Sequence, residues 1–130
     1  MKRIILLTLV LTCRAAQATE WVLVTKTTNE KTFLVDASRI KSAGGVRRAW
    51  VKIVEVPHRV MTENGQYVSF SIARWAFNCS EETARPETGT EYYENGTAHL
   101  SQDMRTTMTP VTPDSVISIL LQFICSWKPK

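Results

Sequence analysis

Apolar and polar residues alternate along most of this chain, which is the pattern of β-strands that bury one face. Alternating or β-branched runs occupy residues 21–26, 32–35, 46–56, 67–78 and 97–100. Short polar segments rich in Gly, Asn and Pro separate these runs, and such segments favour turns. The pattern therefore predicts an antiparallel sheet that opens with a hairpin over residues 21–35.

Two Asn-Gly pairs are the strongest turn signals in the chain. Asn64-Gly65 and Asn95-Gly96 each lie between strand-like runs. Both central residues of a two-residue type I′ turn need positive φ, which Asn and Gly tolerate. We therefore expect a two-residue turn at each pair. Such a turn fixes the register of its flanking strands, and with it the side chains that share a face.

The C-terminal residues change to a helical period. Thr112 suits the N-cap, Pro113 the first helical position, and Asp114 the positive end of the helix dipole. Apolar residues then recur at helical spacing at Val116, Ile117, Leu120, Phe123, Ile124 and Trp127. A membrane span needs about 20 residues, so we expect this shorter helix to pack on the sheet.

An apolar sheet face follows from the register that Asn64-Gly65 predicts. A two-residue turn there places on one face the residues Val51, Ile53, Phe70 and Ile72. The opposite face carries Cys79 and is the one we expect to meet the helix. The first face then has no element of the chain to cover it, and we expect it to mediate homodimerisation or target binding. The alternatives are a bulge near Pro57 that flips the register, or a curled sheet that buries both faces.

The first 18 residues read as a cleavable export signal. Lys2 and Arg3 precede a short apolar run over residues 4–11, and Ala16-Gln17-Ala18 is an A-x-A cleavage site. Cleavage after Ala18 leaves residues 19–130 as a single domain, which is periplasmic or secreted. Acylation of Cys13, which would make an outer-membrane lipoprotein, is disfavoured because the Leu and the small residue that precede an acylated cysteine are missing.

The net charge of the chain depends on removal of this signal. The full sequence carries 16 basic and 12 acidic residues, a net charge of +4. Residues 1–18 hold three of the basic residues and none of the acidic ones, so 13 basic residues remain against 12 acidic ones. No clustered basic excess remains to bind a phosphate backbone, and we expect no nucleic-acid partner.

Cys79 and Cys125 are the two cysteines that remain once Cys13 leaves with the signal. In an oxidising compartment an even number of cysteines favours a disulfide. Closing a loop of this length restricts the unfolded chain by about 4 kcal/mol on the entropic model. Two cysteines and two distant histidines supply too few ligands for a zinc site, so we expect no metal and no other cofactor.

The sequence contains no recognisable catalytic constellation. Its histidines are His58 and His99, and the turn at Asn95-Gly96 would place His99 on a solvent-facing side. The glutamates from Glu81 to Glu94 lie in a segment rich in Glu, Thr and Pro, which is more often a solvated loop than a catalytic site. A phosphate-binding Gly-rich loop and a nucleophile elbow are both missing. We therefore expect a protein that is not an enzyme.

Several short motifs follow one another along the predicted mature chain. They are Trp21, Asp36–Ile40, Arg48–Lys52, Cys79, Tyr92-Tyr93 with Asn95-Gly96, Pro110–Ser115 and Cys125. In this order, and with its paired cysteines, the chain resembles the surface-adhesin protein E family of small exported bacterial proteins. The resemblance covers essentially all of residues 19–130. It implies an α+β fold: an antiparallel sheet of about six strands, a C-terminal helix packed on one face, and one disulfide.

The resemblance also implies a binding function. The founding member of that family is an outer-membrane lipoprotein adhesin for host extracellular-matrix and plasma proteins such as vitronectin, laminin and plasminogen. The Ala16-Gln17-Ala18 site departs from this pattern, because it would release a protein that an adhesin needs to keep at the cell surface. Two hypotheses follow: a non-enzymatic exported protein that binds a host protein, and a periplasmic partner-binding protein such as an inhibitor or envelope factor. Fold alone does not choose between them.

Overall fold

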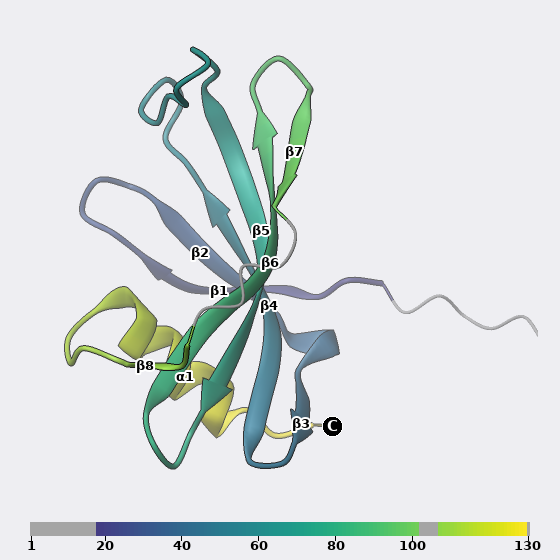
Figure 1. Ribbon diagram of the computed structural model, residues 1–130, viewed down its shortest axis with the longest axis vertical. Coiled ribbons are helices and arrows are strands. Elements are labelled where there is room, and N and C mark those ends of the chain that lie inside the picture. Colours follow the sequence, from purple (N-terminus) through teal and green to yellow (C-terminus); the bar gives the residue numbers. More distant parts are fainter. Residues whose placement is uncertain (1–17, 102–106, 130) are drawn as a thin grey trace, which may run out of the picture.

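The computed structural model describes residues 18–101 and 107–129, which form an antiparallel sheet and a C-terminal helix (Figure 1). Across the sheet the strands follow the order β1, β2, β4, β5, β6, β7, with β3 paired to β4 and β8 paired to β6. The strands are β1 Trp21–Lys26, β2 Thr32–Asp36, β3 Lys41–Ala43, β4 Val46–Val54, β5 Val68–Asn78, β6 Thr83–Tyr93, β7 Ala98–Ser101 and β8 Thr109–Pro110. A 3-10 helix, η1 Ala37–Arg39, follows β2, and α1 spans Val116–Ser126. The predicted opening hairpin, the antiparallel sheet and the C-terminal helix are confirmed.

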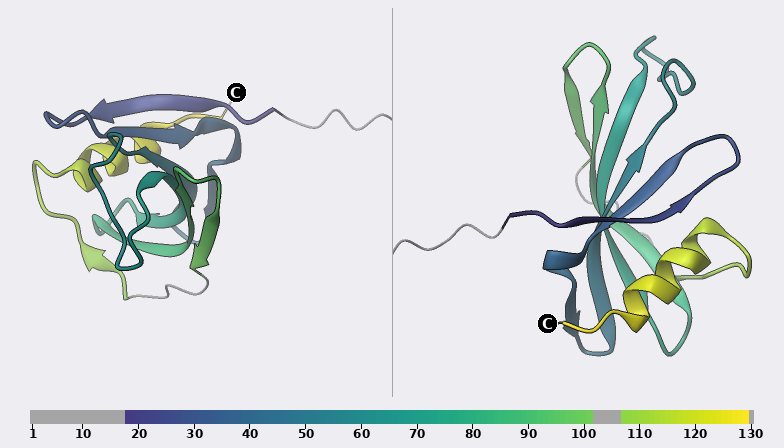
Figure 2. Two further views of the ribbon diagram at one scale, coloured as in Figure 1. Left: turned by 90° about the horizontal axis from the view of Figure 1, so that it is seen from above. Right: turned by 180° about the vertical axis from the view of Figure 1, so that it is seen from behind.

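The sheet is strongly twisted and curls around the helix. In Figure 1 the strands cross near the centre of the molecule and fan apart toward both ends. Seen from above, α1 lies between β1 and β8 on the open side of the curved sheet (Figure 2). We call the side that meets α1 the inner face and the opposite side the outer face. The core between the inner face and the helix consists of Phe33, Val35, Ala49, Val51, Phe77, Ala84, Leu120, Leu121 and Ile124.

The two-residue turn of the sheet is made by Gly44-Gly45. Ala43 pairs with Val46 across it, and the two glycines have φ of +58° and +77°. These are the positive values that a type I′ turn requires. The preceding strand β3 is short, polar and exposed, so the hydrophobic pattern of the sequence does not reveal this hairpin.

Both Asn-Gly pairs lie in three-residue loops, so the prediction of two-residue turns is wrong. At Asn64-Gly65 the Thr62 amide donates to the Gln66 carbonyl at 2.8 Å, and Gly65 has φ of +76°. A three-residue loop of this kind needs positive φ only at its Gly, which is why the Asn keeps negative φ. The two residues that close each loop are therefore one position further apart than predicted.

The hairpin at Asn95-Gly96 shows the effect of this difference on β7. The structure pairs Tyr92 with Ala98 and Glu91 with His99. His99 therefore shares a face with Glu91, whereas the two-residue turn would have placed it with Tyr92. Its side chain is exposed on that face.

The connection between β4 and β5 shifts their register by an odd number of residues. A two-residue turn at Asn64-Gly65 would pair Val51 with Asn78, but the structure pairs Val51 with Ala73. The three-residue loop accounts for one of the five positions of this difference, since Met61 still pairs with Tyr67. Residues 55–60 absorb the other four, partly in a turn at which His58 has φ of +58°. An odd shift exchanges the faces of one strand relative to the other.

The predicted grouping of four interface residues on one face is consequently wrong. Val51 and Ile53 lie on the inner face and pack in or against the core with Phe77. Phe70 and Ile72 lie on the outer face, because they pair with Val54 and Lys52. The exchange of faces comes from the three-residue loop at Asn64-Gly65, which shifts the register by one position. The residues near Pro57 shift it by a further four, an even number that leaves the faces unchanged.

The helix begins three residues later than predicted. Ser115, not Thr112, is the N-cap, and its Oγ accepts a hydrogen bond from the Ser118 amide at 3.2 Å. Pro113 and Asp114 form a turn before the helix, and Asp114 has φ of +58°. A left-handed residue cannot continue a right-handed helix, so α1 starts only after it.

Arg47 of β4 caps the other end of the helix. The last turn of α1 contains no basic residue of its own. Arg47 Nη1 donates to the carbonyls of Ile124 and Trp127, at 2.7 Å each. Carbonyls at a helix C-terminus lack intrahelical partners, and a positive charge there complements the helix dipole. Arg47 thus joins the end of α1 to the sheet.

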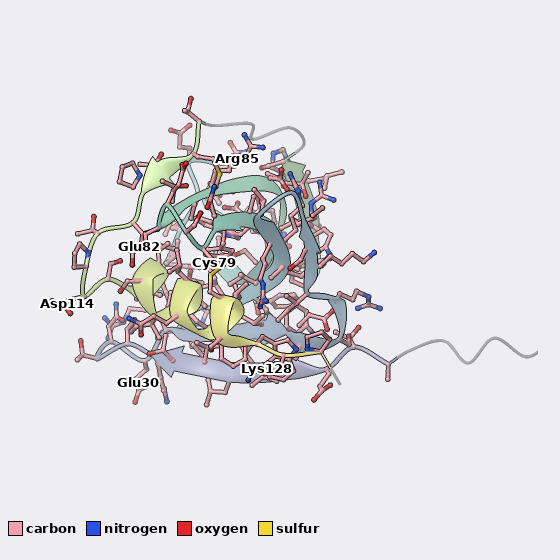
Figure 3. All side chains as sticks on the ribbon, turned by 90° about the horizontal axis from the view of Figure 1, so that it is seen from below. Glu30, Cys79, Glu82, Arg85, Asp114 and Lys128 are labelled. Atoms are coloured by element: carbon pink, nitrogen blue, oxygen red, sulfur yellow. A yellow bond between two sulfur atoms is a disulfide. The ribbon has the colours of Figure 1, made fainter. Side chains whose placement is uncertain are left out.

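The predicted Cys79–Cys125 disulfide is present. It connects the residue after β5 to the last turn of α1, with 5.7 Å between the two Cα atoms. Figure 3 shows Cys79 beside the helix, on the inner side of the sheet. The disulfide and Arg47 together hold the C-terminal end of α1 against the inner face, which leaves the outer face to be considered as a binding surface.

The Glu-, Thr- and Pro-rich segment forms the strand β6, so its interpretation as a solvated loop is wrong. It pairs with β5 on one side and with β7 and β8 on the other. Trp75 pairs with Pro86 and Arg74 pairs with Thr88, which leaves Glu87 without a partner in the ladder. Pro86 cannot donate to a ladder, and this β-bulge accommodates it. The bulge also brings Glu87 to the outer face.

Candidate binding surface

The outer face carries apolar and aromatic side chains from one edge of the sheet to the other. The strand pairings place there Trp21, Leu23, Leu34, Trp50, Lys52, Phe70, Ile72, Tyr92 and Leu100. Leu23 and Leu100, near the two edges, are 60% and 54% exposed, and the others are half-buried. Within residues 18–101 and 107–129 no helix or further strand packs over this face. Continuous apolar surface of this kind is typical of an interface.

Lys52 lies at the centre of an aromatic cluster on this face, formed with Trp21, Phe70 and Tyr92. Its Nζ is 4.5 Å from the ring centroid of Phe70 and 5.8 Å from that of Trp21. Phe70 also stacks on Tyr92, with 4.5 Å between ring centroids and 16° between planes. Cation–π contacts of about 0.5–1 kcal/mol at exposed sites hold such rings in position. Ordered aromatic side chains are the common anchors of protein interfaces.

Glu87 gathers three arginines at the end of the outer face that adjoins β3. We call Arg48, Arg74 and Arg85, with Glu87, the arginine cluster. Glu87 Oε1 lies 2.8 Å from Arg48 Nε and 3.3 Å from Arg74 Nε, and Oε2 lies 3.5 Å from Arg85 Nη2. Figure 3 shows Arg85 extending from β6. One carboxylate faces three guanidinium groups, so the cluster keeps a positive charge.

The charge of Glu87 is maintained despite its burial. Its side chain is 10% exposed, and this burial acts to raise its pKa. The hydrogen bond from Arg48 and the charges of Arg48, Arg74 and Arg85 outweigh the burial and hold the pKa below its usual value. Burial likewise acts to raise the pKa of Asp36, but bonds from Ser38 and Arg39 hold that pKa below its usual value too. Both groups are therefore carboxylates at neutral pH.

Two adjoining hollows connect the arginine cluster to the aromatic cluster. The smaller, of about 130 Å³, is lined by Arg39, Lys41, Arg48, Ala49, Trp50 and Arg74. The larger, of about 420 Å³, is lined by Thr19, Trp21, Asp36, Arg39, Trp50 and Ile72. Arg39 and Trp50 line both, so the two hollows adjoin on the outer face. We call the two together the outer groove.

Two other cavities lie near the N-terminal end of the helix. One, of about 420 Å³, includes Glu82 and Asp114 in its lining, and Figure 3 shows both residues beyond that end of α1. The second, of about 310 Å³, lies between Trp75, Ile117 and β8. Half of the residues that line the first cavity are polar, namely Glu82, Asp114, Ser118 and Gln122, whereas the second cavity is mainly apolar.

The described residues bring no metal-ligating constellation together. In residues 18–101 and 107–129 no group of three or more His, Cys, Asp or Glu is placed to hold a metal ion. His58 Nδ1 lies 3.0 Å from Glu94 Oε2, and its ring packs edge-on against Tyr67 at an exposed position. No helix of this part of the chain is long and apolar enough to cross a membrane.

The structure separates the four interface residues that the sequence predicts. Phe70 and Ile72 lie on the outer face, within the surface described above, whereas Val51 is 1% exposed and Ile53 packs against the core. Sequence reasoning missed Glu87 and the arginines around it, because these come from three strands and no sequence spacing links them. Tyr92 was visible as part of a strand-like run, but its face could not be assigned without the correct register.

Comparison with known families matches nearly the whole described domain. The family model described as Surface-adhesin protein E matches residues 21–126. This range runs from the first residue of β1 to the last residue of α1. A comparison with curated proteins finds no match.

Solved structures of protein E share the fold of this chain. The structure of Haemophilus influenzae protein E has a TM-score of 0.59 and 16% sequence identity, and the similarity covers 82% of this chain and 83% of that one. A second crystal form has a TM-score of 0.59 and 13% identity, covering 82% and 87%. Protein E from non-typeable Haemophilus influenzae has a TM-score of 0.56 and 14% identity, covering 86% and 79%. At these identities the similarity concerns the fold alone.

Proposed function

The chain belongs to the surface-adhesin protein E family, and we propose that it is a non-enzymatic exported protein that binds a protein partner through its outer face. The observation that carries this proposal is the aromatic and apolar surface that extends from Leu23 to Leu100 with no described element over it. Patches of this kind mark interaction sites. Phe70 and Ile72 are the anchors we expect at its centre.

We propose a host extracellular-matrix or plasma protein as the partner. Membership of a surface-adhesin family supports both export and protein binding. The resemblance to that family supports ligands of the vitronectin, laminin or plasminogen type. A second copy of the chain is the competing occupant of the outer face, and light scattering of the mature protein separates a homodimer from a monomer that binds a different protein.

The alternative is a periplasmic partner-binding protein, an inhibitor or envelope factor. The observation in its favour is the Ala16-Gln17-Ala18 site, since cleavage after Ala18 would leave residues 19–130 without a lipid anchor. Most of this signal, residues 1–17, lies outside the described residues. The intact mass of the protein from its native host tests the cleavage, because an acylated Cys13 would add fatty chains and residues 13–18.

Two measurements test the proposed function. Digestion by an external protease on intact cells is expected for a surface adhesin, and protection is expected for a periplasmic protein. Binding of the mature protein to immobilised matrix and plasma proteins is then compared between Ile72→Glu and Ile119→Glu. Both positions are apolar and accessible, but Ile72 lies on the outer face and Ile119 on the helix. Loss of binding in the first variant alone supports the proposal, and equal binding by both contradicts it.

A further inference from the structure

The outer groove ends at a row of basic side chains that crosses four strands. The pairings align Lys41 of β3, Arg48 of β4, Ala76 of β5 and Arg85 of β6. Ala76 is fully buried between its two arginine neighbours. Because strands are about 4.8 Å apart, Arg48 and Arg85 project about 10 Å from each other, on either side of this small residue. The row therefore places three cations on one face, with the Glu87 carboxylate bound between Arg48 and Arg85.

The charges around the outer groove do not cancel. Five cations, Arg39, Lys41, Arg48, Arg74 and Arg85, face two carboxylates, Asp36 and Glu87. Asp36 is held by Arg39 at 2.7 Å, and Glu87 is shared among three arginines. Lys41 is exposed and makes no ion pair with any described residue. Arg74 lines the smaller hollow, and its side chain is 43% exposed although its Nε is buried beside Glu87. Guanidinium and ammonium groups placed in this way favour a carboxylate or sulfate group of a ligand.

Two tryptophans lie next to these cations. Trp50 lines both hollows of the outer groove, and Trp21 lines the larger one with Ile72. Trp rings provide flat apolar area with a polar edge, against which the carbon face of a sugar ring can pack. The groove thus combines an anion site with a flat apolar floor.

We propose that the outer groove binds a sulfated glycan. A sulfate group would lie in the smaller hollow against Arg74, Lys41 and Arg39, and its sugar ring would lie on Trp50. An acidic peptide is the competing ligand class, but β4 and β5 are paired over most of their length, and only Ala49 and Trp50 of β4 lack a strand partner on one side, so little backbone is free to pair with a peptide chain. A glycan requires only side chains. The sulfate position does not depend on the identity of the protein partner, because the smaller hollow lies at the basic end of the outer face and is lined by neither Phe70 nor Ile72.

The test compares two double variants with the same change of net charge. Lys41→Gln with Arg74→Gln removes two cations of the groove, and Lys26→Gln with Arg59→Gln removes two exposed cations outside it. Glu87 stays in place in both, so the arginine cluster keeps its organising carboxylate. Lys41→Gln alone is included because it alters an exposed side chain with no ion pair, and its thermal melting temperature is expected to equal that of the parent.

The probe is a heparin-derived oligosaccharide, titrated by calorimetry at physiological salt into the mature protein. We expect saturable binding by the parent, an affinity at least tenfold lower in the groove double variant, a smaller loss in Lys41→Gln, and a change under threefold in the control. Binding by the parent is expected to weaken with rising salt.

The proposal is overturned if the parent does not bind, if the chemically desulfated oligosaccharide binds equally well, if both double variants lose affinity alike, or if poly-glutamate binds more tightly. Phe70→Ser separates the two proposals, because Phe70 belongs to the aromatic cluster and lines neither hollow of the outer groove. Loss of host-protein binding with glycan binding retained in this variant distinguishes them.

Discussion

Replacing Arg47 by Met is expected to loosen the C-terminal end of α1. The Met side chain retains the unbranched stem but removes both hydrogen bonds from Nη1 to the carbonyls of Ile124 and Trp127. A hydrogen bond to a charged group contributes about 1.5–3 kcal/mol. The two bonds here share one nitrogen atom, so we expect a loss of about 2–3 kcal/mol in the free energy of unfolding, near the value for one strong bond.

Urea denaturation of the oxidised protein at neutral pH measures this loss. The midpoint should fall while the denaturant slope stays unchanged, because the surface exposed on unfolding is the same. For a domain of this size the melting temperature should fall by roughly 10–20 °C. Amide exchange should accelerate in the last turn of α1. Arg47→Lys should recover part of the stability, since an ammonium group restores the charge but not the fork geometry.

Arg59→Met is the matched control for this prediction. Arg59 is exposed in the connection between β4 and β5, and its replacement should change the free energy of unfolding by less than about 0.5 kcal/mol. If Arg47→Met costs less than about 1 kcal/mol, or no more than Arg59→Met, the two carbonyl contacts do not hold the helix and the reasoning is refuted.

Replacing Cys79 and Cys125 together by Ala should lower the free energy of unfolding by about 4 kcal/mol, as expected for a sequence separation of 46. Urea denaturation of this variant beside the reduced parent protein measures the loss, and a loss under about 1 kcal/mol contradicts the prediction. Ile53→Glu should unfold the protein, whereas Ile72→Glu should cost under about 1 kcal/mol in thermal melts; equal costs would contradict the register. The pKa of Glu87 is lowered on folding, so its stabilisation is complete above the unfolded pKa of about 4.3 and is lost as the pH falls through the folded pKa. Glu87→Gln should therefore be less stable than the parent at neutral pH, and its free energy of unfolding should fall less on acidification. Identical pH profiles of the urea midpoints of the two proteins would exclude a stabilising role for the ionised Glu87.

Strand β6 shows why the candidate site was only partly predictable. Its sequence contains Glu, Pro and Gly, which are depleted in strands, yet it pairs on both sides in the sheet. Sheet pairing is a tertiary interaction that overrides weak local preference. The position of Glu87 depends further on a bulge at Pro86, and a bulge is decided by the partner strand as much as by the bulged one.

The sequence by itself determined the local and the covalent features of this protein. Period-two alternation was sufficient to predict β1, β2, β4 and β5, and the helical period was sufficient to predict α1. Each pattern shows which side of an element is buried. The two cysteines that remain after the predicted signal were sufficient to predict the Cys79–Cys125 disulfide. That prediction depends on the oxidising compartment and on the number of cysteines more than on detailed geometry.

Only the tertiary structure decided which side chains share a face. The register between β4 and β5 depends on the length of the loop at Asn64-Gly65 and on residues 55–60, which carry little periodic signal. The error of one position in the loop exchanges the faces of β5 relative to β4. For the same reason Val51 and Ile53 lie in the core while Phe70 and Ile72 lie outside it. The outer groove likewise combines residues of β1, η1, β3, β4 and β5, which come together through the sheet pairing and twist and have no common spacing in the chain.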